Sequence, residues 1–346
     1  MYKLNYFNFK ERSNNYLITN GLGKFAFISK ADFMNLIQKK NFNNKEKFNE
    51  LLEKKFVYNV EEEIFAEESF KNVRKQKNYL FSGTSLHIFV VTKNCNFNCV
   101  YCQAGNLNQK NSYNMSKEVA KEAVNIALQS PSDYLTFEFQ GGEPLLNFDI
   151  IKYIVEYSKL INKEKYITYN LVSNLTLLTN EMIDFFIEND IDICTSIDGD
   201  KDIQNYNRPF AEKDSYEETI RNIKKLQKSG KNVNAIQTTT KYSLDKYKEI
   251  IDEYIKLGLK TVFLRPLTKL GKADENWKNV GYEAEEFLKF YKNSLDYIDK
   301  KVQEGEDISE GHRNILLKNI NDSKPINYME LRSPCGGAIR TTYVLL

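Results

Sequence analysis

Leu86-His-Ile-Phe-Val-Val-Thr92, followed after two residues by Cys95-Asn-Phe-Asn-Cys99-Val-Tyr-Cys102, is the stretch from which the fold can be predicted. The first seven residues form a short apolar run that is typical of a buried β-strand. The three cysteines come directly after it. In parallel α/β barrels, functional residues gather where strands end. We therefore expect a thiol-rich loop at the carboxyl end of a parallel sheet.

The rest of the chain continues this pattern, because apolar strand-like runs alternate with amphipathic helical stretches. Such alternation implies right-handed crossovers and a parallel sheet. Six units are too few for a closed eight-fold barrel, so the predicted fold is α/β with a partial (β/α)6 TIM-like barrel. The strands are expected at 86–92, 134–140, 166–173, 191–197, 233–240 and 261–267, the helices at 116–129, 148–161, 180–189, 216–228 and 244–257, and a long closing helix at 282–303.

The first eighty residues have a different organisation. Three short β-prone runs are followed by two amphipathic helices, which predicts a small α+β, winged-helix-like module. This module either recognises a peptide or caps the main domain. The charged stretch 61–77 is expected to be a linker. The expected domains are residues 1–78, 79–305 and 306–346.

Bulk composition excludes several classes of function. The 49 Lys and Arg residues nearly cancel the 47 Asp and Glu residues, so no strong field favours nucleic acid or an anionic membrane. No apolar run approaches the roughly 20 residues needed to span a bilayer. The amino-terminal residues do not form a signal peptide, and a cytoplasmic location is expected.

The cysteine trio points to an iron–sulfur cluster. Three thiolates, from Cys95, Cys99 and Cys102, can bind three irons of a [4Fe–4S] cube and leave the fourth iron open. Zinc would normally take a fourth Cys or a His, and the chain has only two histidines. A structural zinc site, or unrelated buried cysteines, is the alternative. Cys194, inside an apolar run, is expected to be a small core residue.

The CxxxCxxC spacing with the aromatic Tyr101 before the last cysteine resembles the signature of the radical S-adenosylmethionine (SAM) superfamily. A second motif, Gln140-Gly141-Gly142-Glu143-Pro, ends the next predicted strand. Paired glycines let a backbone approach a ligand closely. The resemblance implies that Gly141, Gly142 and Glu143 bind the methionine amino group of SAM, and that [4Fe–4S] and SAM are the cofactors.

Later strands carry further matches. Ser196-Ile-Asp-Gly199 resembles a segment of radical SAM peptide maturases whose serine contacts SAM, and the resemblance places Arg208 on the SAM carboxylate. A planar guanidinium suits bidentate carboxylate binding. Leu267 falls where the family packs a residue against adenine, although a core leucine would look the same. Ser173, in Val-Ser-Asn, matches a site that usually reads Thr-Asn-Gly.

The chain looks most similar to SPASM-type peptide maturases, near the anaerobic sulfatase-maturating enzymes and closest to the His-Xaa-Ser system radical SAM maturase. Cys335, in Ser-Pro-Cys-Gly-Gly, resembles the first ligand of an auxiliary cluster. Too few cysteines accompany it for a second cluster, so we expect either that the extension is truncated or that the auxiliary clusters have been lost. Glu310 lies near the position of an acidic proton acceptor in these relatives; the alternative is a solvated glutamate at a helix start.

The resemblance implies an enzyme that cleaves SAM reductively and abstracts hydrogen from a side chain of a ribosomally made peptide or protein. Its implied partners are a leader-bearing peptide and an external one-electron donor of the flavodoxin or ferredoxin type. Two alternatives remain open: a sulfatase-type maturase that forms formylglycine, and a non-catalytic iron–sulfur or peptide-binding partner protein.

Overall fold

The computed structural model describes residues 2–38, 42, 44–81, 83–103, 113–211, 214–321 and 341–344. Its internal contacts divide the chain into two compact units, Met1–Phe81 and Ser82–Leu346. The predicted boundary lay at 78/79. Each unit is described by itself.

The amino-terminal unit is an antiparallel sheet covered by helices. The sheet order is β2-β3-β4. A separate strand pair is formed by β1, which precedes this sheet in the sequence, and β5, which follows it. Its core includes Ile18, Phe33, Leu36, Leu51 and Phe56. The elements are β1 (Lys3–Leu4), β2 (Phe7–Arg12), β3 (Asn15–Asn20), β4 (Phe25–Ser29), α1 (Lys30–Ile37), α2 (Lys45–Glu53) and β5 (Val57–Tyr58).

The stretch expected to be a linker forms a helix, α3 (Glu62–Gln76), which belongs to the amino-terminal unit. Acidic residues occupy its first turn, and Arg74 and Lys75 occupy its last, an arrangement that the helix dipole favours. The helix buries no residue fully, and it is rich in charged side chains. Its sequence therefore shows no clear apolar stripe from which a helix could be predicted. It is held in its own unit by the ring of Phe65, stacked 4.0 Å from that of Tyr58.

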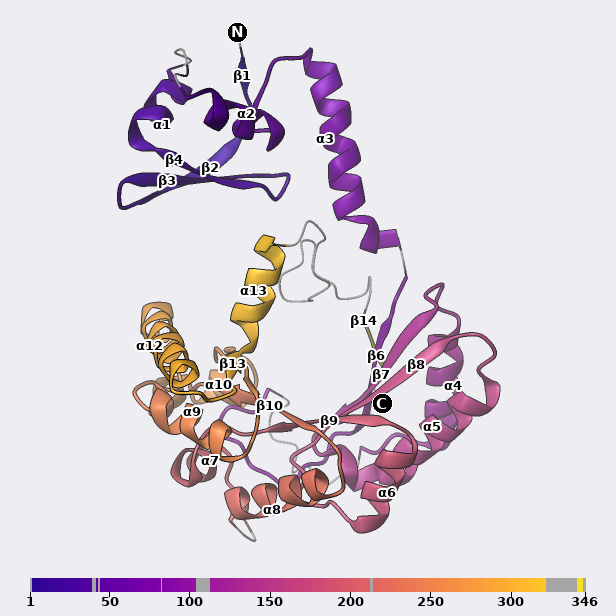
Figure 1. The fold of residues 1–346 in the computed structure, drawn as a ribbon. Coiled ribbons are helices and arrows are strands. Elements are labelled where there is room, and N and C mark those ends of the chain that lie inside the picture. Colours follow the sequence, from indigo (N-terminus) through magenta and orange to yellow (C-terminus); the bar gives the residue numbers. More distant parts are fainter. Residues whose placement is uncertain are drawn as a thin grey trace. The chain divides into compact units, whose positions relative to one another are not determined.

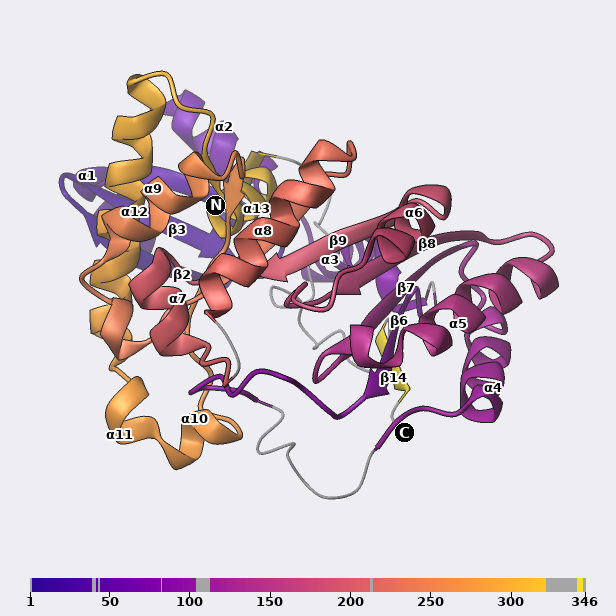
Figure 2. The same ribbon diagram turned by 90° about the horizontal axis from the view of Figure 1, so that it is seen from below.

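The large unit is built on one seven-stranded parallel sheet, in the order β12-β10-β9-β8-β7-β6-β14 (Figures 1 and 2). Helices follow one another around the outside of this sheet. The predicted partial barrel is thereby confirmed. The strands are β6 (Leu86–Thr92), β7 (Tyr134–Gly141), β8 (Tyr166–Val172), β9 (Ile191–Ser196), β10 (Val233–Thr238), β12 (Leu264–Arg265) and β14 (Thr341–Val344). The main helices are α4 (Lys117–Leu128), α5 (Phe148–Ile161), α6 (Asn180–Glu188), α8 (Ser215–Lys228), α9 (Tyr247–Lys256) and α12 (Ala284–Gln303).

The structure departs from the predicted pattern at its sixth strand. That strand is split into β11 (Thr261–Val262) and β12, and β11 pairs with β13 (Ser309–Glu310) instead of joining the main sheet. Several short elements were not predicted, and two of them border the barrel site and sheet. These two are α7 (Lys201–Asn207) and the edge strand β14, which pairs in parallel with β6.

Side chains alternate between the two faces of each barrel strand, as the two-residue period of a strand requires. On β7, Leu135, Phe137 and Phe139 are buried in the apolar core, whereas Glu138 and Gln140 are only partly buried. Polar residues on the inner face can therefore reach a ligand where the strands end. Among the described residues, no helix is both long enough and apolar enough to cross a membrane.

Candidate functional site

The cysteine loop is fixed by segments far away in the sequence. The N–H of Asn98 donates to Pro209 O (2.9 Å), and the N–H of Val100 donates to Asn207 O (3.0 Å). The carbonyl of Cys102 accepts a hydrogen bond from Lys272 N (3.0 Å). These backbone contacts hold the loop at the carboxyl ends of the strands.

The three predicted cluster ligands, Cys95, Cys99 and Cys102, line one cavity of about 350 Å³. Burial raises the pKa of Cys95 to about 12 and that of Cys99 to about 11, although Arg208 opposes the shift at Cys99. Metal binding must therefore displace protons from these thiols. Among the described residues, no three His, Cys, Asp or Glu side chains converge on a single-ion site. Separate thiols around one cavity suit a cluster in which each iron takes one thiolate.

The paired glycines are required by packing within the chain. A Cβ on Gly142 would lie 2.2 Å from Asn94 O, and one on Gly141 would lie 2.5 Å from Thr92 O. Backbone hydrogen bonds run across the same gap, from Gly142 N to Thr92 O (2.9 Å) and from Glu143 N to Asn94 O (2.8 Å). The glycines therefore bring the end of β7 against the backbone of the cysteine loop.

Glu143 is fully buried and presents its carboxylate to the cavity wall. The carboxylate accepts hydrogen bonds from Ser173 Oγ (2.7 Å), Asn174 N (2.8 Å) and Leu145 N (3.0 Å). Burial raises the pKa of Glu143 to about 7, because these hydrogen bonds only partly offset the loss of solvent. Ser173 therefore both contacts Glu143 and lines the cavity.

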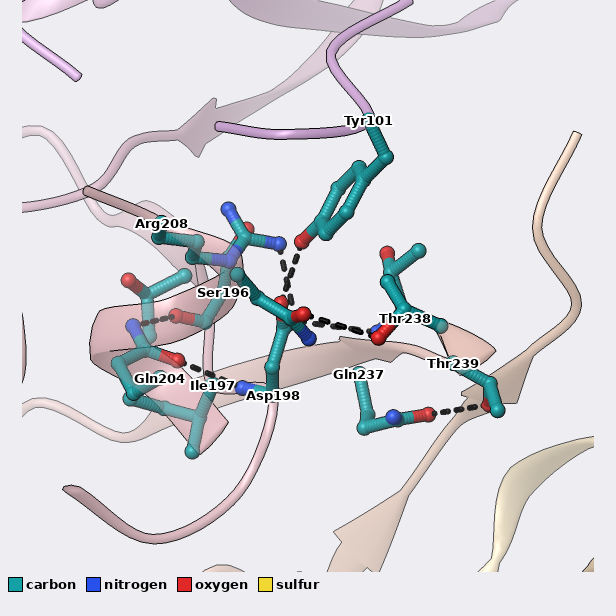
Figure 3. A network of polar contacts seen from close by, with 12 residues as sticks. Tyr101, Ser196, Ile197, Asp198, Gln204, Arg208, Gln237, Thr238 and Thr239 are labelled. Carbon is teal, nitrogen blue, oxygen red and sulfur yellow. Dashed lines mark hydrogen bonds and ion pairs between the residues drawn. The ribbon is translucent and has the colours of Figure 1, made fainter. Parts of the chain in front are cut away.

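Arg208 takes part in a buried polar network (Figure 3). Its Nη2 lies 3.1 Å from Asp198 Oδ1, and its guanidinium carbon lies 5.3 Å from the ring centre of Tyr101. The Tyr101 hydroxyl donates to Asp198 Oδ2 (2.5 Å). Burial keeps the pKa of Tyr101 well above its usual value, so the hydroxyl is the donor. The sequence prediction missed Asp198, although it stands inside the quoted Ser-Ile-Asp-Gly motif.

Ser196 and Leu267 line the same cavity, so the structure brings the predicted SAM contacts together. Leu267 is half-buried, and its N–H donates to the Tyr282 hydroxyl (2.6 Å). Unpredicted polar residues also line the cavity, among them Gln140, Thr238 and Arg265. They are inner-face residues near strand ends, so the two-residue period could have identified them.

Glu310 does not line this cavity. It is fully buried on β13, at the start of α13 (Gly311–Asn321), and its carboxylate accepts from Tyr291 OH (2.5 Å) and Arg313 N (2.6 Å) and contacts His312 Nδ1 (3.2 Å). Burial pushes its pKa up, but these hydrogen bonds outweigh burial and leave the pKa below its usual value. The alternative of a solvated glutamate was therefore wrong, because the side chain is inaccessible.

Of the two remaining cysteines, Cys194 and Cys335, the structure describes only Cys194. Cys194 is only partly buried on β9. Burial, together with the charge of Glu138, raises its pKa to about 12. Cys335 lies outside the described residues.

The residues around the cavity fit an iron–sulfur cluster with SAM. Three thiols lie on its wall, Glu143 can meet an ammonium group, and the buried Nε of Arg208 has no partner among the described residues. That unused donor can meet a carboxylate. The cavity volume lies in the range of small-molecule sites.

Comparison with known proteins gives the same result. Residues 89–240 match the model of the radical SAM superfamily. An uncharacterized protein of Methanocaldococcus jannaschii, MJ0907, is 32% identical over 194 residues, which cover 55% of this chain and 66% of that protein. The cysteine-type anaerobic sulfatase-maturating enzyme of Clostridium perfringens (strain ATCC 13124) is 26% identical over 244 residues, which cover 68% of this chain and 66% of the enzyme.

A solved structure agrees with these relatives. The structure of native anSMEcpe with bound AdoMet is 25% identical and has a TM-score of 0.63, over 70% of this chain and 67% of that one. The chain thus spans just under two thirds of the length of both curated relatives. Residues 89–240 therefore form a radical SAM domain, and the family of enzymes to which that domain belongs uses a [4Fe–4S] cluster and SAM.

Proposed function

We propose that this enzyme modifies a side chain of a ribosomally made peptide or protein. The observation that carries the proposal is the single cavity that collects the cysteine loop, the Gly-Gly-Glu segment and Arg208. The relationship to a sulfatase-maturating enzyme supports a polypeptide substrate. The intact set of cofactor-binding residues argues against a non-catalytic partner protein.

In this proposal, Cys95, Cys99 and Cys102 hold the cluster through their thiolates. When bound, the cluster and SAM would supply the reductive cleavage of SAM and the removal of a hydrogen atom from the substrate. The work of the chain is to orient SAM and to exclude water and stray hydrogen donors from the cavity.

The remaining contacts define how SAM is oriented. Glu143, with the backbone at Gly141 and Gly142, would receive the methionine ammonium group. Arg208 and Ser196 would receive its carboxylate end, and Leu267 would pack against adenine. Ser173 would position Glu143 through the 2.7 Å hydrogen bond. Glu310 remains a proposed proton acceptor, but it lies outside the cavity and its carboxylate is already hydrogen-bonded to Tyr291 and Arg313.

The amino-terminal unit would recognise the leader of the substrate. Within its three-stranded sheet, β2 and β4 are both edge strands, and among the described residues each has one side without a strand partner. An extended peptide can add to such an edge through backbone hydrogen bonds. Its lysines are interleaved with glutamates and asparagines, so a peptide suits it better than a nucleic acid.

An external donor of the flavodoxin or ferredoxin type would deliver the electron. Among the described residues, Cys194 is the only cysteine outside the loop, and one thiol cannot hold a second cluster. Residues 306–346 would begin a SPASM-like extension, of which Cys335 lies outside the described residues.

A second candidate function is formylglycine formation. It is favoured by the 26% identity to the sulfatase-maturating enzyme over 68% of this chain. The two candidates differ in substrate, which is a leader-bearing precursor peptide in the first and a sulfatase peptide in the second.

One experiment tests both candidates. The anaerobically reconstituted chain is mixed with SAM and dithionite, and 5′-deoxyadenosine is measured with a leader-bearing precursor peptide, with a cysteine-containing sulfatase peptide, and without peptide. We expect peptide-dependent product and a mass change in the precursor alone. A mass change confined to the sulfatase peptide would favour formylglycine formation. Absence of 5′-deoxyadenosine from iron-loaded protein would reject both.

A further inference from the structure

Asp198 is a fully buried carboxylate that collects donors from three separate parts of the barrel. Arg208 Nη2 (3.1 Å) and Thr238 N (3.1 Å) both donate to its Oδ1, and the Tyr101 hydroxyl donates to its Oδ2 (2.5 Å). Figure 3 shows the three donors directed at this one side chain. One anion therefore joins the cysteine loop, the end of α7 and the end of β10.

The backbone that carries Asp198 is held as firmly as its side chain. Its N–H donates to Gln204 Oε1 (2.7 Å), and Gln204 Nε2 donates back to Ser196 O (3.1 Å). Gln204 is itself inaccessible to solvent on α7. The turn after β9 is thus fixed at both ends, so the carboxylate has a defined position before any ligand arrives.

This position determines how Arg208 is presented. Asp198 occupies Nη2, while the buried Nε has no partner among the described residues. The guanidinium also lies over the ring of Tyr101. Because the guanidinium is planar, a partner on one nitrogen and a ring against its face fix the direction of the remaining donors. Arg208 also lines the cavity, so those donors are available to an anionic ligand group there.

We propose that Asp198 is a positioning residue, which sets Arg208 for the carboxylate of SAM and ties that contact to the cysteine loop through Tyr101. Tyr101 lies between Cys99 and Cys102, so its hydrogen bond to Asp198 connects the loop to the same anion. The inference rests on SAM occupying this cavity. It does not depend on the peptide substrate proposed above.

The test is SAM affinity of iron-loaded Asp198→Asn, measured anaerobically by equilibrium dialysis without any peptide. The amide keeps the shape of the side chain and removes its charge. We expect the SAM dissociation constant to rise about 10- to 100-fold, the size of effect that follows when the partner that orients a metal ligand is removed. Iron content should stay unchanged. Asp192→Asn, the same substitution at an exposed position of β9, is the matched control and should bind SAM normally.

A double variant separates positioning from a general structural role. If Asp198 acts through Arg208, Asp198→Asn should add little to the loss caused by Arg208→Gln, because interacting residues are non-additive. The change that SAM causes in the electron paramagnetic resonance spectrum of the reduced cluster should need correspondingly more SAM in Asp198→Asn. An unchanged dissociation constant, or losses that multiply in the double variant, would overturn the proposal.

A milder substitution covers the case in which Asp198→Asn fails to fold or to hold iron. Tyr101→Phe removes one hydroxyl and keeps the ring beneath the guanidinium. The proposal requires the SAM dissociation constant of this variant to rise; an unchanged value rejects the connection. Failure of the proposed peptide modification would appear only in the peptide assay, so the two failures are distinguishable.

Discussion

Glu143, at the end of β7, and Glu310, on β13, are both fully buried but lie in different surroundings. Glu143 faces the cavity, and burial raises its pKa to about 7. Glu310 lies away from the cavity, and despite its burial, hydrogen bonds from His312, Tyr291 and the Arg313 N–H lower its pKa. Burial alone therefore does not identify a functional carboxylate. Two features distinguish Glu143 from Glu310. It lines the cavity, and its hydrogen bonds do not fully offset the effect of burial on its pKa.

The largest expected effect is the loss of the cluster. We expect the cluster to depend on the cysteines that line the cavity and not on cysteines elsewhere in the chain. Cys95→Ala, Cys99→Ala or Cys102→Ala should each abolish iron binding and 5′-deoxyadenosine formation, because no spare described thiol can replace the lost ligand. Cys194→Ala and Cys335→Ala should retain about four irons per chain. Iron analysis and absorbance near ~400 nm check this. Equal iron in all five variants would show that the loop is not the cluster site.

Gly142→Ala should be nearly as damaging, through packing. The added Cβ would lie 2.2 Å from Asn94 O, so the loop next to Cys95 has to move. We expect reduced iron content together with weakened SAM binding. Gly21→Ala, where nothing lies within 4 Å, is the control and should match the unmodified chain. Normal iron and normal SAM titration in Gly142→Ala would contradict the described approach of β7 to the loop.

The two glutamates can be compared directly with one substitution. Glu143→Gln should weaken SAM binding by about 1.5–3 kcal/mol, or roughly tenfold or more, since it removes a charged hydrogen-bond partner. Glu310→Gln should leave SAM binding intact and lower the free energy of unfolding by about 1–3 kcal/mol, because a buried hydrogen-bonded network is disturbed. Urea denaturation and SAM titration of both variants separate these effects. Weakened SAM binding in Glu310→Gln, with normal SAM binding in Glu143→Gln, would contradict this distinction between the two glutamates.

The last expected effect is a dependence of SAM affinity on pH. The pKa of Glu143 is raised to about 7 without ligand, so the side chain is protonated below that pH and charged above it. SAM affinity should rise with pH through about 7, by about tenfold per unit below the pKa. Stability without ligand should change in the opposite sense. The unfolded chain loses this proton near its ordinary value of 4.5, so stability falls as pH rises from there to about 7. Glu143→Gln should remove both dependences.

Sequence patterns predicted the barrel well where strands are long and apolar. The predicted bounds of β6 match the structure, and those of α5 do as well, because their periodicity is strong and their ends carry clear signals. The cysteine and Gly-Gly-Glu motifs identified residues that the structure gathers around one cavity. These motifs are local, so the spacing within each is visible in the sequence.

Features that depend on distant packing were not predictable in the same way. The sixth strand breaks at Phe263, whose ring approaches within 2.3 Å of the position that a Cβ on Gly311 would take. The strand β14 has only four residues, and its partner β6 lies far away in the sequence. The contacts of Asp198 were not predictable for the same reason. Its donor Tyr101 lies in the cysteine loop, and its donor Thr238 ends β10, so both are distant from it in the sequence.

The bond between Tyr101 and Asp198 spans 97 residues and has an evolutionary consequence. Losing the tyrosine hydroxyl alone leaves a buried carboxylate short of a donor, and losing the carboxylate alone leaves both a hydroxyl and a buried guanidinium without their acceptor. Single replacements at either position should therefore be selected against. Among homologous sequences, the residue before the last loop cysteine and the acid after β9 should change together, as a covarying pair.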